Sequence, residues 1–186
     1  QHLPRRGTPQ ALYIRRTEIV TDTPEPVWQE ALLSEDDIGK VVRTHLYVES
    51  LVNEFISEFV PYPAHLDAIQ LDYFGKVHLS LAMGLPEKLK GILLGIGGLR
   101  NAFAHRPGQR LDKNNMKNFF DSFSPEQKNE LMERTRNLSW VASGKQWRDI
   151  SPADQFSVMA ISAYYMVQVE ILLMKQARDH QKEIGR

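Results

Sequence analysis

Apolar residues recur every three or four positions through most of the chain after residue 33, which is the spacing of amphipathic helices. This spacing predicts four long helices, over Ser34–Phe59, Pro63–Met83, Pro86–His105 and Ser151–Lys182, the third of which is stopped by Arg106-Pro107-Gly108. Shorter helices are expected after Asp112 and after Ser124. The chain shows no internal repeat and no alternation typical of half-buried strands. We therefore expect an all-α bundle of about five to six helices.

The first 33 residues lack this regular pattern and are expected to form an irregular N-terminal arm, in which residues 27–33 can make a short helix. Arg5, Arg6, Arg15 and Arg16 make the arm basic, which fits either a solvated tail or an arm that contacts nucleic acid. Residues 34–186 are expected to form one helical-bundle domain, because a chain of 186 residues with 42% hydrophobic content can bury a core. Within it, residues 137–149 are expected as a packed loop or a short hairpin.

Several helix starts carry capping signals. Ser34 precedes three acidic residues, and Ser124 precedes a proline with Gln127 at the third helical position. Both serines are expected to be N-caps, and Asp112 is a further candidate cap.

The helix over residues 86–105 has two different faces. Its large apolar residues form one stripe: Leu89, Ile92, Leu93, Ile96, Leu99 and Phe103. The other side is small, with Gly91, Gly95, Gly98 and Ala102. Since each glycine disfavours a helix by roughly 1 kcal/mol relative to alanine, we expect another backbone to approach this side closely, and a second copy of the chain is one candidate.

Composition narrows the range of functions. The 23 basic and 23 acidic residues cancel, so general electrostatic attraction to nucleic acid or membrane is not expected. There is no cysteine, and the six histidines are scattered, so we expect no metal site and no cofactor. No run of about eighteen apolar residues and no charged-then-apolar leader is visible, which predicts a cytoplasmic protein without a membrane segment.

The candidate catalytic residues lie at the end of this helix and are Arg100, Asn101 and His105. Imidazole suits proton transfer near neutral pH, and guanidinium suits the charge that develops on a phosphate. Metal-independent RNA cleavage needs little more, because RNA supplies its own 2′-hydroxyl nucleophile. Since Arg100 and His105 lie about 140° apart around a regular helix, they meet only if the helix end unwinds or if two copies pair.

A structural role for the same residues is the alternative. Arg100 lies on or beside the apolar stripe, so it is expected to need a partner, for which Glu49 and Glu54 are candidates. His105 would then cap the last carbonyls of the helix. His45, on the apolar side of the first long helix, is expected as a hydrogen-bonded core histidine.

The run Arg100-Asn101-Ala102-Phe103-Ala104-His105, on the third long helix of an α-bundle, resembles the signature of the HEPN superfamily. This resemblance implies a homodimer whose paired motifs form a cleft, and a metal-independent endoribonuclease of toxin–antitoxin, defence or RNA-processing systems. It implies that Arg100 and His105 are catalytic and that Asn101 supports them, with RNA as substrate and an antitoxin as a possible protein partner. Arg106 has no counterpart in the motif and is expected to bind substrate.

A fainter likeness covers residues 39–105, where Gly39-Lys40-Val41-Val42-Arg43-Thr44-His45-Leu46, the later Leu-rich helix and the Arg-to-His ending are similar to the mannitol operon repressor family. This likeness implies a non-catalytic regulator of transcription that acts through protein partners. Neither family accounts for residues 1–33 or 106–150.

Overall fold

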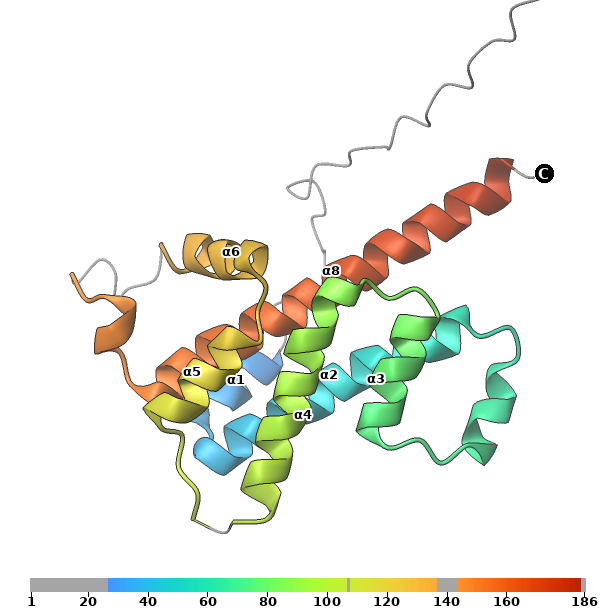
Figure 1. Ribbon diagram of the computed structural model, residues 1–186. Helices are drawn as coiled ribbons and strands as arrows, with labels where there is room; N and C mark the ends of the chain where they lie inside the picture. Colours follow the sequence, from blue (N-terminus) through green and yellow to red (C-terminus); the bar gives the residue numbers. More distant parts are fainter. Residues whose placement is uncertain (1–26, 107, 137–143, 185–186) are drawn as a thin grey trace, which may run out of the picture.

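The computed structural model describes residues 27–106, 108–136 and 144–184, and the expectation of an all-α bundle is confirmed (Figure 1). The described residues form seven α-helices: α1 (Val27–Ser34), α2 (Asp37–Phe59), α3 (Tyr73–Ala82), α4 (Lys90–Ala104), α5 (Lys113–Asp121), α6 (Pro125–Thr135) and α8 (Pro152–Ile184). Three short 3-10 helices join them: η2 (Pro63–Ala68), η3 (Glu87–Leu89) and η4 (Trp147–Asp149). No β-strand occurs in these ranges.

Helix α2 is the element around which the others pack. It contacts α1, α3, α4 and α8, and Figure 1 shows it running through the middle of the bundle. Its inward residues Val48, Val52 and Phe55 follow helical spacing and are fully buried. Across from them, α8 contributes Met159 and Val167, which are also fully buried. The hydrophobic core therefore forms around α2, with further buried residues from α8, α4 and α5.

Helix α8 contains a stretch of 18 residues with a mean hydropathy of 1.6, which is long and apolar enough to cross a membrane. The sequence pattern did not lead us to expect such a helix, but length and composition alone are weak evidence for a membrane segment. Moreover, 56% of this stretch is buried inside the protein, as in a helix at the core of a bundle.

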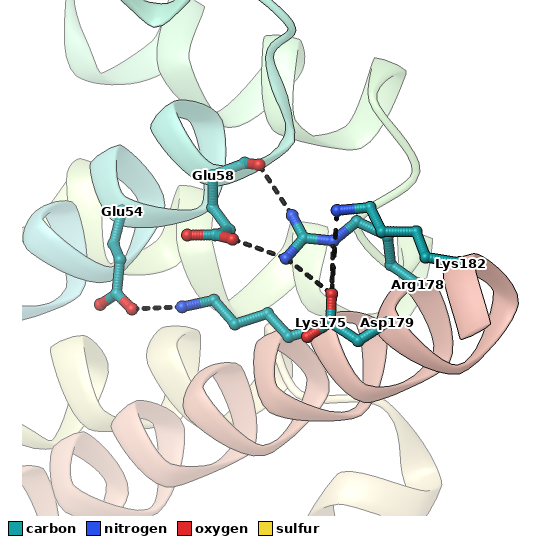
Figure 2. Close-up of polar contacts among 6 residues, drawn as sticks. All are labelled: Glu54, Glu58, Lys175, Arg178, Asp179 and Lys182. Carbon is teal, nitrogen blue, oxygen red and sulfur yellow. Dashed lines mark hydrogen bonds and ion pairs between the residues drawn. The ribbon is translucent and has the colours of Figure 1, made fainter. Parts of the chain in front are cut away.

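Ion pairs tie the C-terminal part of α8 to the end of α2. Figure 2 shows Lys175 reaching Glu54, with Nζ and Oε1 2.7 Å apart, and Arg178 reaching both the carboxylate and the carbonyl oxygen of Glu58. The Arg178 guanidinium also lies 4.9 Å from the centre of the Phe59 ring. Beyond these contacts, the last turns of α8 are exposed.

The prediction that Ser34 caps the first long helix is wrong. Ser34 ends α1, where its hydroxyl donates to the carbonyl of Ala31, and Asp36 caps α2 by accepting from the Gly39 N–H at 2.7 Å. The ammonium of Lys40 donates to the carbonyls of residues 32 and 33, which closes α1 as a separate helix. Because Leu32 is fully buried, α1 packs into the bundle although it lies within the expected arm.

The single helix predicted over residues 63–83 is also wrong. The backbone is extended at Ile69, which separates η2 from α3, and Asp72 caps α3 by accepting from the Gly75 N–H at 2.8 Å. By contrast, the caps predicted at Asp112 and Ser124 are confirmed, and both belong to complete capping boxes. Residues 1–26 of the arm and 137–143 of the expected loop or hairpin lie outside the described residues.

Candidate functional site

Helix α4 carries the Arg-to-His motif and packs against α2, α3 and α5. Its apolar stripe is buried as predicted, with Leu99 and Phe103 on either side of the motif's first residues. Arg100 and Asn101 between them are exposed. The helix therefore uses one face for the core and presents these two polar side chains beside it.

The small side of α4 meets another backbone, as predicted, over its first half only. A Cβ atom on Gly91 would overlap the carbonyl oxygen of Ser122, and one on Gly95 would lie 2.8 Å from the Ser122 hydroxyl. Ser122 directly follows α5 of the same chain, so this close approach is intramolecular. A Cβ on Gly98 would meet nothing within 4 Å, and Ala102 is exposed, so the second half stays open.

Arg100 has no carboxylate partner within the described residues, because no Asp or Glu oxygen lies within 4.0 Å of its guanidinium. Its Nη1 instead donates to Oδ1 of Asn101 at 3.1 Å. The two acids proposed as partners are engaged elsewhere, Glu49 with Lys76 and Glu54 with Lys175. Within the described residues, neither of the predicted ion pairs of Arg100 with Glu49 or Glu54 is therefore formed.

His105 lies at the C-terminal end of α4 and is exposed, as is Arg106. His105 is the C-cap residue just after the helix, with φ −97° and ψ −2°, and its N–H donates to the carbonyl of Phe103. Because α4 is helical through Ala104, helix geometry places Arg100 and His105 roughly 140° apart around its axis. Within one chain, the structure does not bring them to a common point.

Arg100 and Asn101 instead border a cavity of about 580 Å³ between α2, α3 and α4. Its other lining residues are His45 and Glu49 from α2, Tyr73 and Phe74 from α3 with Asp72 before them, and Leu94, Gly97 and Gly98 from α4. His105 and Arg106 do not line it. The cavity combines aromatic, apolar and charged groups, which is typical of sites for small ligands.

His45 is buried, as predicted, and faces this cavity from α2. Its Nδ1 lies 3.6 Å from Oε2 of Glu49, so the hydrogen bond expected for a core histidine is not formed there. Burial lowers the pKa of His45 below its usual 6.5, and the charges of Arg100 and Lys76 lower that pKa further, while Glu49 opposes the shift. His45 is therefore a neutral imidazole at pH 7.

Tyr73 lines the cavity from α3. Its hydroxyl donates to the carbonyl of Leu93 at 2.9 Å, its ring centre lies 4.4 Å from that of His45, and burial strongly raises its pKa. A Cβ on Gly97 would lie 2.8 Å from two carbons of the ring, so the absence of a side chain there lets α3 and α4 approach. Tyr73 thus stays neutral and fixed.

Sequence reasoning identified Arg100 and Asn101 but missed the cavity beside them. His45 and Glu49 are four residues apart in a helical pattern, which places them on one face and was a usable signal. Nothing in the local pattern marks Tyr73, because α3 reaches α4 only in the folded chain. Among the described residues, no group of three His, Asp or Glu side chains is placed to hold a metal ion.

The fold and the site together define an all-α bundle with a mixed aromatic and charged cavity next to an exposed Arg–Asn pair. The chain matches no family model, and no curated protein or solved structure shows significant similarity to it.

Proposed function

We propose that the protein is a metal-independent endoribonuclease of the HEPN type that acts as a homodimer. Arg100 stabilises the charge on the phosphate, His105 transfers the proton, and Arg106 contributes to substrate binding. The attacking group is the 2′-hydroxyl of the RNA itself.

The observation that carries this proposal is the exposure of Arg100 without a carboxylate partner in the described part of the chain. A guanidinium neutralised by an acid binds phosphate weakly, whereas a free one offers several donors in a planar fork. Asn101 accepts from Nη1 and leaves the other donors of Arg100 available. His105 is exposed as well, so both groups are accessible to RNA.

The geometry of α4 supports the dimer. Since helix geometry places Arg100 and His105 on different sides of α4, and only Arg100 lines the cavity, a site that uses both takes Arg100 from one subunit and His105 from the other. The open half of the small face, at Gly98 and Ala102, allows a second α4 to approach.

The test is incubation with RNA in EDTA. Wild type is expected to cleave, and His105→Ala to lower the rate at least about a hundredfold, the contribution of a general acid–base group. Arg100→Lys keeps the charge but loses the planar fork, so it is also expected to slow cleavage. His65→Ala, at another exposed histidine, is the matched control and should cleave like wild type. Equal cleavage by wild type and His105→Ala, or none by either, would overturn the proposal.

The second candidate is a non-catalytic regulator of the mannitol operon repressor type, which acts on transcription through protein partners. The observation that favours it is the presence of Glu49 and Asp72 beside Arg100, because carboxylates repel phosphate. Absence of cleavage in EDTA, together with a folded dimer, would support this candidate.

A further inference from the structure

The cavity between α2, α3 and α4 presents hydrogen-bond acceptors that the protein leaves partly unused. Oε1 of Glu49 accepts from Lys76 at 2.6 Å, which holds the carboxylate in place, while Oε2 lies 3.6 Å from Nδ1 of His45, beyond hydrogen-bond distance. Asp72 caps α3 through Oδ1, and its other oxygen accepts no hydrogen bond from the described residues. A ligand that fits this cavity must therefore bring donors.

The same cavity has an aromatic rim. Phe74 is 59% exposed although it is a large apolar residue, and the centre of its ring lies 4.3 Å from that of His78. The Phe74 ring is therefore held by a neighbouring ring and is still accessible to solvent. Exposed aromatic rings of this kind are used to stack nucleobases.

The charges of the cavity residues and the position of Arg100 indicate that the ligand includes a nucleobase. Arg100 and Asn101 form the mouth of the cavity, so a phosphate held by Arg100 leaves its attached nucleoside within reach of the interior. Lys76 pairs with Glu49, and His45 is neutral at pH 7, so neither of them attracts a second phosphate. The interior therefore fits an uncharged planar group with N–H donors.

Among the four RNA bases, guanine alone presents two adjacent N–H donors, N1–H and the 2-amino group, on its pairing edge. Adenine and cytosine place an acceptor next to their amino group, and uracil flanks its single N–H with two carbonyls, so a carboxylate repels part of each edge. We propose that this cavity binds the guanine base of the nucleotide whose phosphate Arg100 holds, with Glu49 as the acceptor. This inference rests on the proposed ribonuclease function and adds a base preference to it.

The primary test measures binding by the full-length chain without any cleavage. Calorimetric titration with GMP, IMP, AMP and UMP is expected to give the tightest binding for GMP. IMP lacks only the 2-amino group, and its loss is expected to weaken binding about tenfold, the effect of one unmade hydrogen bond to a charged group. Equal affinity for GMP and UMP, or no binding of GMP at millimolar concentration, would overturn the inference.

Two glutamates of α2 provide a matched pair of variants. Glu49→Gln is expected to abolish the preference for GMP over IMP, because Lys76 attracts the amide oxygen and the amide N–H₂ then faces the base, where it repels the N–H donors of guanine. Glu54→Gln removes a similar lysine pair, with Lys175 at 2.7 Å (Figure 2), but lies outside the cavity and should keep the preference. Phe74→Ala removes the ring on which the base stacks and is expected to weaken GMP binding severalfold while thermal unfolding shows an intact fold. GMP affinity and preference that survive both cavity variants would place the binding elsewhere.

The failures of the two proposals are distinguishable. RNA cleavage without GMP binding leaves the ribonuclease and removes the guanine site. GMP binding without RNA cleavage leaves the cavity as a nucleotide site and removes the ribonuclease. A guanine-containing DNA oligonucleotide, which lacks the 2′-hydroxyl and is not cleaved, should bind more tightly than GMP; weaker binding would show that the cavity takes free nucleotides only and would overturn its role in RNA recognition.

Discussion

At the scale of single residues, Arg100 and His45 line the same cavity but differ in burial. Arg100 stays in solvent at the mouth, where its charge costs little. His45 is buried between Glu49, Tyr73 and Lys76, where the charged form of the imidazole is disfavoured. The cavity thus has a cationic mouth and a neutral histidine inside.

The lowered pKa of His45 predicts how stability changes with pH. The unfolded chain takes up a proton at this histidine near pH 6.5, whereas the folded chain does so only at lower pH. As pH falls below 6.5, the unfolded state therefore binds more protons, and the free energy of unfolding is expected to decrease until the folded pKa is passed. Urea unfolding between pH 7.5 and 5.0 measures this decrease.

His45→Gln is expected to flatten that decrease because the variant has no group to titrate at this position. His65→Gln, at an exposed histidine, serves as the control and should keep the wild-type slope. A wild-type slope in His45→Gln would show that His45 takes up its proton equally well in the folded state.

At the scale of elements, α4 is held by different neighbours along its length. Its first half lies against the end of α5 through Gly91 and Gly95, and its middle approaches α3 through Gly97. Its second half, from Gly98 onward, exposes one side to solvent. The glycines of α4 therefore lie in three environments: against α5, against α3 and in solvent. The sequence alone does not distinguish these environments.

This difference predicts opposite effects of the same substitution. Gly98→Ala is expected to raise the free energy of unfolding by about 0.5–1 kcal/mol, because alanine favours the helix and its Cβ meets open space. Gly91→Ala is expected to lower it by about 1–3 kcal/mol, because the added Cβ overlaps the Ser122 carbonyl oxygen and the backbones must separate. Urea unfolding of both variants gives the comparison, and equal signs would contradict the packing of α4 on α5.

At the scale of the whole molecule, α2 contacts both α8 and α4 and so connects these two helices. The ion pairs of Figure 2 join α2 and α8 at one end, and α1, α5 and α6 cover α8. One side of the C-terminal half of α4, at Gly98 and Ala102, remains exposed, and this is where the proposed dimer would form.

Mixing two inactive variants tests the composite site in that dimer. Arg100→Ala and His105→Ala are each expected to lack ribonuclease activity, but a mixed dimer contains one intact site with Arg100 from one subunit and His105 from the other. After exchange of subunits, the mixture is expected to regain about a quarter of wild-type activity, since half of the dimers are mixed and each has one of two sites. A mixture as inactive as its components would show that each site lies within one chain.

Much of the fold was predictable because helices are specified by local rules. Spacing of apolar residues located α2, α4 and α8, and the caps at Asp112 and Ser124 were identified from short patterns. The errors fell at helix starts, where a different residue is the N-cap. Asp36, and not Ser34, caps α2, and Asp72 caps a separate helix within the region predicted as one helix after Pro63.

The sequence by itself determined the helical class, the buried stripe of α4 and the presence of Arg100, Asn101 and His105 at its end, because these depend on residues a few positions apart. Only the tertiary structure decided that Glu49 pairs with Lys76 and not with Arg100, and that Tyr73 and Phe74 join His45 around one cavity. The physical reason is that these contacts connect α2, α3 and α4, whose relative placement follows from packing of the whole core and from no local pattern.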